Sequence, residues 1–198
     1  MTDNSSLVNQ VFRQALTNVF GVSGIVLDIG CGPGQYRESL GDGYIGLDLT
    51  SEPYKDGVSR GTDIVGDARW IPLAEGSLDA AFSVAAIHQV PGPGNAISEV
   101  FRALKPGGKF LLFDYNWRTL NRLRKKGDGR GISGNRVLHT QWGWKRELES
   151  SGFAETRLWL EPEFEGRRYG RLERWVRLLR NEVRDGGWAC VSGTKPLN

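Results

Sequence analysis

The sequence predicts one α/β domain built on a doubly wound, mostly parallel sheet. Short apolar runs rich in β-branched residues alternate along the chain with segments of helical periodicity, which is typical of parallel strands joined by helical crossovers. The length of 198 residues suits a single domain and is enough to bury a sheet with helices on both faces.

The first half of the chain opens with an expected amphipathic helix over residues 7–20, where apolar residues recur with helical spacing. Residues 25–29 are apolar on both faces, as expected of a strand inside a parallel sheet. A glycine-rich turn and a short helix follow. The next strands are expected at residues 44–49, 64–65 and 78–85.

The second half continues the alternation. A helix over residues 95–104 is expected to stop at Lys105–Gly108, because proline and glycine there break helical structure, and a strand follows at 109–114. The remaining expected elements are a helix at 144–151, a strand at 153–160, a helix at 169–180 and a strand at 188–194. Residues 126–134, rich in glycine and charge, are expected to form a loop.

Composition excludes several classes of protein. Hydrophobic residues make up 39% and charged residues 25%, and no apolar stretch approaches the ~20 residues of a membrane helix. Residues 1–10 lack the basic start and apolar run of a secretory signal. Cys31 and Cys190 are far apart and have no neighbour at metal-ligand spacing. We therefore expect a cytoplasmic protein with neither a disulfide framework nor a metal site nor a membrane partner.

The strongest local signal is a buried strand that runs directly into a turn with a glycine at every second position. Residues 26–34 read VLDIGCGPG. Glycine lets the backbone approach a ligand closely, because a Cβ at Gly30 or Gly32 would occupy that space. In doubly wound sheets the binding crevice lies at the carboxyl ends of the strands, where the winding reverses. A ligand is therefore expected at the end of this first strand.

The spacing of the glycines narrows the choice of ligand. The dinucleotide fingerprint G-x-G-x-x-G requires a third glycine on the following helix, whereas here glycines fall at 30, 32 and 34. A ligand without a pyrophosphate is favoured. Asp48 ends the second expected strand, where a carboxylate can accept hydrogen bonds from two ribose hydroxyls of either kind of ligand.

The pattern resembles the class I S-adenosylmethionine-dependent methyltransferases, particularly the small-molecule type with the D-x-G-C-G-x-G motif. The resemblance extends over nearly the whole chain. After the first motif it includes GLD at 46–48, GDARWIPL at 66–73, GSLDAAFS at 76–83, IH at 87–88, EVFRALKPGG at 99–108 and SGF at 151–153. It implies a Rossmann-like, three-layer fold with seven strands, of which the last, residues 188–194, is antiparallel.

The resemblance also implies which residues would bind S-adenosyl-L-methionine and its product S-adenosyl-L-homocysteine. Asp48 would hold the ribose, with Leu49 beside the adenine. Asp67 would accept a hydrogen bond from the adenine amino group, while the Ala68 N–H would contact a ring nitrogen. The residues implied around the methionine end are Asp28, Gly30, Cys31, Gly32 and Gly34, and those facing the sulfonium are Ala85 and His88.

A base is needed only if the acceptor is a hydroxyl, whose proton must be removed. His88 is our first candidate, because the motif determines its place after the fourth strand. His139 is the second histidine of the chain, and Asp114 and Tyr115 are further candidates at the end of the fifth strand.

The chain carries a net charge of +3, and its arginines and aromatics gather in two regions, 115–145 and 161–186, which we expect to bind the substrate. Aromatic side chains can stack on a flat small molecule, and arginines can form bidentate contacts with an anionic one. An RNA or protein methyltransferase that uses this basic half is the first alternative. A non-catalytic nucleotide-binding regulatory subunit and an NAD-dependent oxidoreductase are the others. An ordinary solvated helix face explains many of the same arginines. The sequence carries no signal for an oligomeric state.

Overall fold

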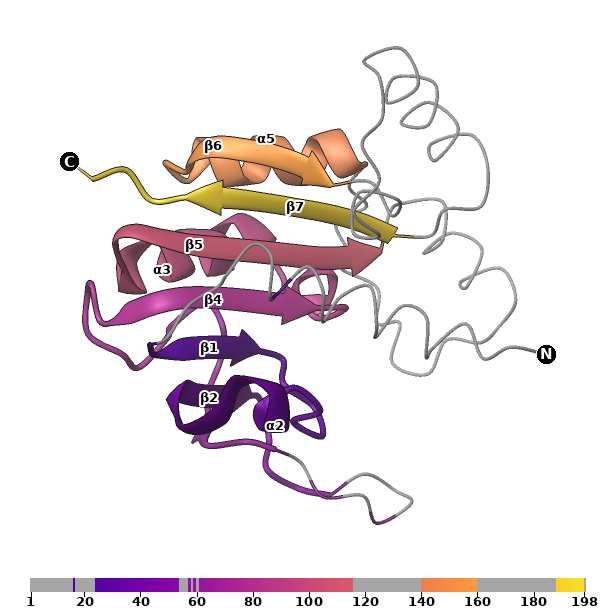
Figure 1. Ribbon diagram of the computed structural model, residues 1–198. Coiled ribbons are helices and arrows are strands. Elements are labelled where there is room, and N and C mark those ends of the chain that lie inside the picture. The colour runs from indigo at the N-terminus through magenta and orange to yellow at the C-terminus, as the bar shows by residue number, and fades with distance from the viewer. Residues whose placement is uncertain are drawn as a thin grey trace, which may run out of the picture.

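The computed structural model describes residue 16 and residues 24–53, 57, 59, 61–115, 140–159 and 188–197. These residues contain one seven-stranded sheet in the order β3-β2-β1-β4-β5-β7-β6 (Figure 1). The strands are β1 (Val26–Ile29), β2 (Tyr44–Asp48), β3 (Ile64–Val65), β4 (Leu78–Val84), β5 (Leu104–Tyr115), β6 (Ala154–Trp159) and β7 (Trp188–Thr194). The helices are α2 (Arg37–Leu40), α3 (Pro93–Ala103) and α5 (Gln141–Ser150), with 3₁₀ turns η1 (Gly41–Gly43) and η2 (Ile87–Gln89).

The strand directions confirm the predicted fold class. The pairs β3–β2, β2–β1, β1–β4 and β4–β5 are parallel, whereas β7 is antiparallel to both of its neighbours, β5 and β6. The order runs outward in opposite senses from the β1–β4 pair. This is the topological switch point, and crossovers leave a crevice there at the carboxyl ends of the strands.

Side chains of β1 alternate between two cores, one on each face of the sheet. Leu27 and Ile29 pack in a cluster with buried side chains of α3 and α5. Val26 belongs to a second cluster, on the opposite face, which includes Tyr36 and the helical residue Leu16. Helices α3 and α5 therefore cover one face, and Leu16 and Tyr36 pack on the other.

Most predicted elements are found within one or two residues of their expected bounds, and the third and seventh strands match them. The main difference is at the start of β5, which begins at Leu104 instead of residue 109. Helix α3 ends at Ala103, just before the predicted stop at 105–108. Residues 105–108 themselves form a bulge within β5. Leu78 pairs with Leu104 and Ala80 pairs with Lys109, so the extra residues are accommodated without ending the strand.

Several expectations lie outside the described residues. These are the opening helix except Leu16, the helix at 169–180, the loop at 126–134 and residue His139. Most of the two basic regions, 115–145 and 161–186, is outside them as well.

Candidate functional site

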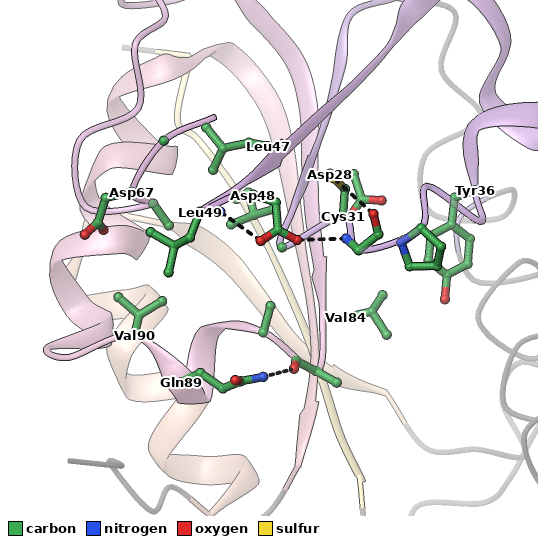
Figure 2. Close-up of a pocket in the computed structure, with 18 of the residues that line it drawn as sticks. Asp28, Cys31, Tyr36, Leu47, Asp48, Leu49, Asp67, Val84, Gln89 and Val90 are labelled. Atoms are coloured by element: carbon green, nitrogen blue, oxygen red, sulfur yellow. Dashed lines mark hydrogen bonds between the residues drawn. The ribbon is translucent and has the colours of Figure 1, made fainter. Parts of the chain in front are cut away.

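A cavity of about 460 Å³ lies at the carboxyl ends of β1, β2 and β4 (Figure 2). The residues that sequence reasoning placed around the cofactor line it, except Gly34 and His88. Its lining consists of Asp28, Ile29, Gly30, Cys31, Gly32, Pro33, Gln35, Tyr36, Leu47, Asp48, Leu49, Gly66, Asp67, Ala68, Val84, Ala85, Ala86, Gln89, Val90 and Pro91. The segments that contribute these residues are far apart in the sequence, and the parallel register of the strands brings them to one edge.

The glycine turn is held tightly against the neighbouring strands. The N–H groups of Gly30 and Cys31 both donate to the Leu47 carbonyl, at 2.8 and 3.1 Å. Gly30 has a φ of +71°, and a Cβ at this position would lie 2.2 Å from the Cβ of Ala86. A side chain at position 30 is thus excluded by Ala86.

Gly34, which the resemblance placed at the methionine end, packs against a neighbouring loop. It does not line the cavity, and a Cβ there would lie 2.8 Å from the Cα of Gly61. Gly61 donates its N–H to the Gly32 carbonyl at 2.8 Å. Gly34 therefore permits the 61–63 segment to pack against the back of the turn.

Asp48 links the glycine turn to the end of β2 (Figure 2). Its Oδ2 accepts the Gly32 N–H at 3.0 Å, and its Oδ1 accepts the Leu49 N–H at 2.8 Å. These two backbone donors orient the carboxylate in the cavity. Leu49 beside it is 71% exposed, which leaves an apolar surface for a flat ring.

Asp67 and Ala68 lie across the cavity from the glycine turn, in the loop after β3. The Asp67 carboxylate forms a bidentate ion pair with Arg69, with an Oδ2–Nη2 distance of 2.6 Å. These hydrogen bonds hold the pKa of Asp67 below its ordinary value. Asp67 therefore presents an ionised acceptor, and Ala68 is buried next to it.

The loop that carries Asp67 is tied to α3. Glu99 Oε2 accepts the Ile71 N–H at 3.0 Å, and Arg102 donates to the carbonyls of Ile71 and Leu73 at 2.9 and 3.0 Å. Glu99 and Arg102 also pair with each other. Backbone groups of an irregular loop are thereby satisfied by a rigid helix, which holds the loop in place beside the cavity.

Asp28 is a buried carboxylate in the lining of the cavity. Its exposed fraction is 1%, and it accepts a hydrogen bond from the Tyr44 hydroxyl at 2.7 Å. Burial raises the pKa of Asp28 to about 7, although the Tyr44 hydrogen bond favours the ionised form. Its neighbour Cys31 is a neutral thiol, because burial raises its pKa to about 11.

His88 is not among the residues that line the cavity. Its side chain is 3% exposed, and its Nδ1 lies 2.5 Å from Asp114 Oδ1. Asp114 also accepts the His88 backbone N–H at 2.9 Å and is itself fully buried. The Tyr115 ring packs edge-on against His88 at 5.3 Å. The structure therefore gathers three of the candidate bases, and His139 lies outside the described residues.

Ala85 and Gln89 form the wall of the cavity after β4. Ala85 has a φ of +53°, which is uncommon for a residue with a side chain, and its N–H donates to the Phe113 carbonyl at 2.8 Å. Its carbonyl accepts the Gln89 side-chain amide at 3.1 Å (Figure 2). Sequence reasoning named Ala85 but missed Gln89, because nothing in its local sequence marks a residue that folds back onto the backbone.

Two tryptophans, Trp144 of region 115–145 and Trp159 of β6, are already engaged within the fold. Trp144 is fully buried in the core between α5 and the sheet. Trp159 donates its indole N–H to Ser192 Oγ at 2.7 Å, and Arg157 stacks over its ring at 3.8 Å. Trp142, in contrast, is 41% exposed.

Within the described part of the chain, no group of three or more histidine, cysteine, aspartate or glutamate side chains is arranged to hold a metal ion. No described helix has the length and apolar character needed to span a bilayer.

Comparison with known proteins shows which families the chain is similar to. A family model described as a methyltransferase domain matches residues 27–112. The chain is 32% identical over 129 residues to a tRNA (carboxymethyluridine(34)-5-O)-methyltransferase of Schizosaccharomyces pombe, covering 62% of this chain and 54% of that protein. It is 30% identical over 147 residues to a malonyl-[acyl-carrier protein] O-methyltransferase of Methylococcus capsulatus, covering 67% of this chain and 53% of that protein. It thus spans about half the length of these two curated relatives.

Among solved structures, the fold is similar to that of an S-adenosylmethionine-dependent methyltransferase from Mesorhizobium loti. The TM-score is 0.66 at 20% identity, and the match covers 96% of this chain and 100% of the other. The matched region 27–112 contains the glycine turn, Asp48 and Asp67. Residues 27–112 of this chain therefore match a methyltransferase domain model, and the chain shares the fold of the Mesorhizobium loti protein.

Proposed function

We propose that the protein is an S-adenosylmethionine-dependent methyltransferase. The observation that carries this proposal is the position of Asp48, which is held by the Gly32 and Leu49 N–H groups at the wall of a cavity beside the glycine-rich turn. A carboxylate oriented in this way suits the two ribose hydroxyls of a nucleoside. The family model and the relatives named above support the same activity.

The lining of the cavity fits the cofactor in charge and shape. Gly30 lets the turn pack against Ala86, and the methionine end would lie next to this turn. The ionised acceptor Asp67 and the neighbouring Ala68 N–H would contact the adenine edge, with Leu49 against its face. Asp28, Cys31 and Gly32 would complete the methionine end. When bound, the cofactor supplies a methyl group made electrophilic by its sulfonium.

The protein's own contribution is to position an acceptor beside that methyl group in a site shielded from water. For a hydroxyl acceptor we propose His88 as the base. Asp114 Oδ1 can accept the proton on His88 Nδ1, which leaves Nε2 able to take a proton. His88→Gln should then lower the rate with a hydroxyl acceptor about 100-fold while the affinity for S-adenosylhomocysteine stays unchanged. An unchanged rate would remove His88 from the mechanism.

For the acceptor we propose a small molecule, and the aromatic and basic residues of regions 115–145 and 161–186 support a flat or anionic one. The two relatives compared above are named for different acceptors, a protein-bound acyl group and a tRNA. A salt-sensitive gel shift with tRNA would instead favour an RNA acceptor. Cofactor binding without turnover across a broad acceptor screen would favour a regulatory subunit.

Calorimetry with S-adenosylhomocysteine tests the proposal directly. Asp48→Ala removes the acceptor of two hydroxyl hydrogen bonds, so its affinity should fall by about 30-fold or more, at ~1–2 kcal/mol for each bond. The matched control is Asp42→Ala, because Asp42 is exposed in η1, just before the amino end of the same strand. Binding of the wild type with no change in Asp48→Ala would refute the assignment of the site. Stabilisation by NAD but not by S-adenosylhomocysteine would refute the proposed function itself.

A further inference from the structure

Tyr44 lies behind the cavity and reaches it only through another side chain. It begins β2, is 4% exposed, and is not among the residues that line the cavity. Its hydroxyl donates to Asp28 Oδ2 at 2.7 Å across the parallel β1–β2 pair. Asp28 does line the cavity, two residues before Gly30. The contact is therefore a buried link between the core and the cavity wall.

The ring of Tyr44 is itself held in place from α2. The Arg37 guanidinium lies 4.5 Å from the centre of the ring, in position for a cation–π contact. Arg37 in turn donates to Asp63 Oδ2 at 2.6 Å and to the Gly61 carbonyl at 3.0 Å. The Tyr44 hydroxyl is thereby held at the Asp28 carboxylate by contacts that do not depend on a ligand.

Charges around Asp28 make its ionisation sensitive to this one hydroxyl. Burial raises the pKa of Asp28 to about 7, the Tyr44 hydrogen bond lowers it, Asp48 on β2 raises it, and Arg37 on α2 lowers it. The Cys31 thiol of the glycine turn is the remaining titratable neighbour. On the β4 side, Asp28 pairs with the apolar Phe82. Near neutral pH, the hydroxyl thus influences how much of the carboxylate is charged.

We propose that Tyr44 is a positioning residue for the amino-acid end of the cofactor, holding the Asp28 carboxylate ionised and oriented to pair with the cofactor's ammonium group. This inference rests on the proposed function. It separates the site into two halves. The nucleoside half depends on Asp48, and the amino-acid half depends on a carboxylate that Tyr44 keeps charged.

The two halves can be measured separately with two ligands. S-adenosylhomocysteine carries the ammonium, whereas 5′-methylthioadenosine has the same nucleoside and sulfur without the amino acid. Below about pH 7 the affinity of the wild type for S-adenosylhomocysteine should fall, by up to tenfold per pH unit, because Asp28 must lose a proton to bind. The affinity for 5′-methylthioadenosine should stay level between pH 5.5 and 8.5.

Tyr44→Phe keeps the ring and removes only the hydroxyl. Losing one hydrogen bond to a charged group should move the midpoint of the pH profile upward by about one unit. The variant should then bind S-adenosylhomocysteine roughly eightfold more weakly than the wild type at pH 6.5, and less than twofold more weakly at pH 8.5. Asp28→Asn should bind weakly at every pH. The control Ser77→Ala, which loses a hydroxyl bond to the Ala74 carbonyl outside the cavity, should match the wild type.

Tyr44→Phe could instead lower the affinity for both ligands equally, or lower the affinity for S-adenosylhomocysteine by the same factor at every pH. Either result would overturn the inference in favour of a purely structural role. If Tyr44→Phe does not fold, the wild-type protein still tests the inference. A wild-type affinity for S-adenosylhomocysteine that does not change with pH would also overturn it. Failure of both ligands to bind the wild type would refute the proposed function together with this role. Binding of 5′-methylthioadenosine alongside a level S-adenosylhomocysteine profile would refute only the role of Tyr44.

Discussion

Replacement of Gly30 by alanine tests the packing of the glycine turn without any ligand. The added methyl group would meet two obstacles. The backbone φ of +71° is unfavourable for a residue with a Cβ, and that Cβ would lie 2.2 Å from the Cβ of Ala86. Real Cβ contacts are essentially never shorter than 3.0 Å, so the backbone of the turn or of residue 86 must shift.

The two obstacles have separable costs. A left-handed backbone costs a non-glycine residue about 1–2 kcal/mol, and overpacking of a tight contact costs about 1–3 kcal/mol. Gly30→Ala should therefore lower the free energy of unfolding by about 2–5 kcal/mol. Gly76 has a similar φ of +63°, but a Cβ there would meet nothing within 4 Å. Gly76→Ala should cost only the backbone part, about 1–2 kcal/mol.

Urea denaturation gives the required free energies, provided that the m-values of the variants agree. A second variant isolates the clash. Adding Ala86→Gly to Gly30→Ala removes the methyl group at 2.2 Å and leaves the Ala86 Cα at 3.7 Å, an ordinary contact distance. The double variant should recover about 1–3 kcal/mol relative to Gly30→Ala. Equal costs for Gly30→Ala and Gly76→Ala, or no recovery in the double variant, would refute the proposed packing of the turn.

Three further predictions concern stability. His88→Ala leaves a fully buried carboxylate on β5 without its imidazole partner and should cost about 3 kcal/mol in urea denaturation, whereas a loss below 1 kcal/mol would contradict the pairing. Arg102→Met removes donors to carbonyls of the 71–73 loop and should cost about 1–2 kcal/mol, with increased amide exchange confined to that loop. The Lys105 hydrogen bond lowers the pKa of Asp79 from 3.8, so its contribution to stability should be lost as pH falls below that value. Asp79→Asn should flatten this part of the stability–pH curve, and an unchanged curve would exclude the contribution.

Local sequence was sufficient to predict the strands and the edge of the sheet at which a ligand is expected. Residues 26–29 have apolar side chains on both sides of the strand and are buried throughout, which is the pattern of a strand inside a parallel sheet. The carboxyl ends of parallel strands meet at one edge of the sheet. The order of the strands along the chain therefore places the glycine turn, which follows β1, beside Asp48 at the end of β2. The bulge in β5 is not predictable in this way, because proline and glycine mark a break without saying whether a strand continues through it.

The contacts that tune the site depended on tertiary structure. The sequence by itself predicted the fold class, the edge of the sheet where the cavity lies and most of the named residues that line it, because strand burial and glycine spacing are properties of consecutive residues. Only the tertiary structure brought Tyr44 to Asp28, Asp114 to His88 and Gly61 to the back of the turn. Those contacts join residues 16 to 27 positions apart, and the pairing of side chains across strands depends on register and rotamer, which no local pattern encodes.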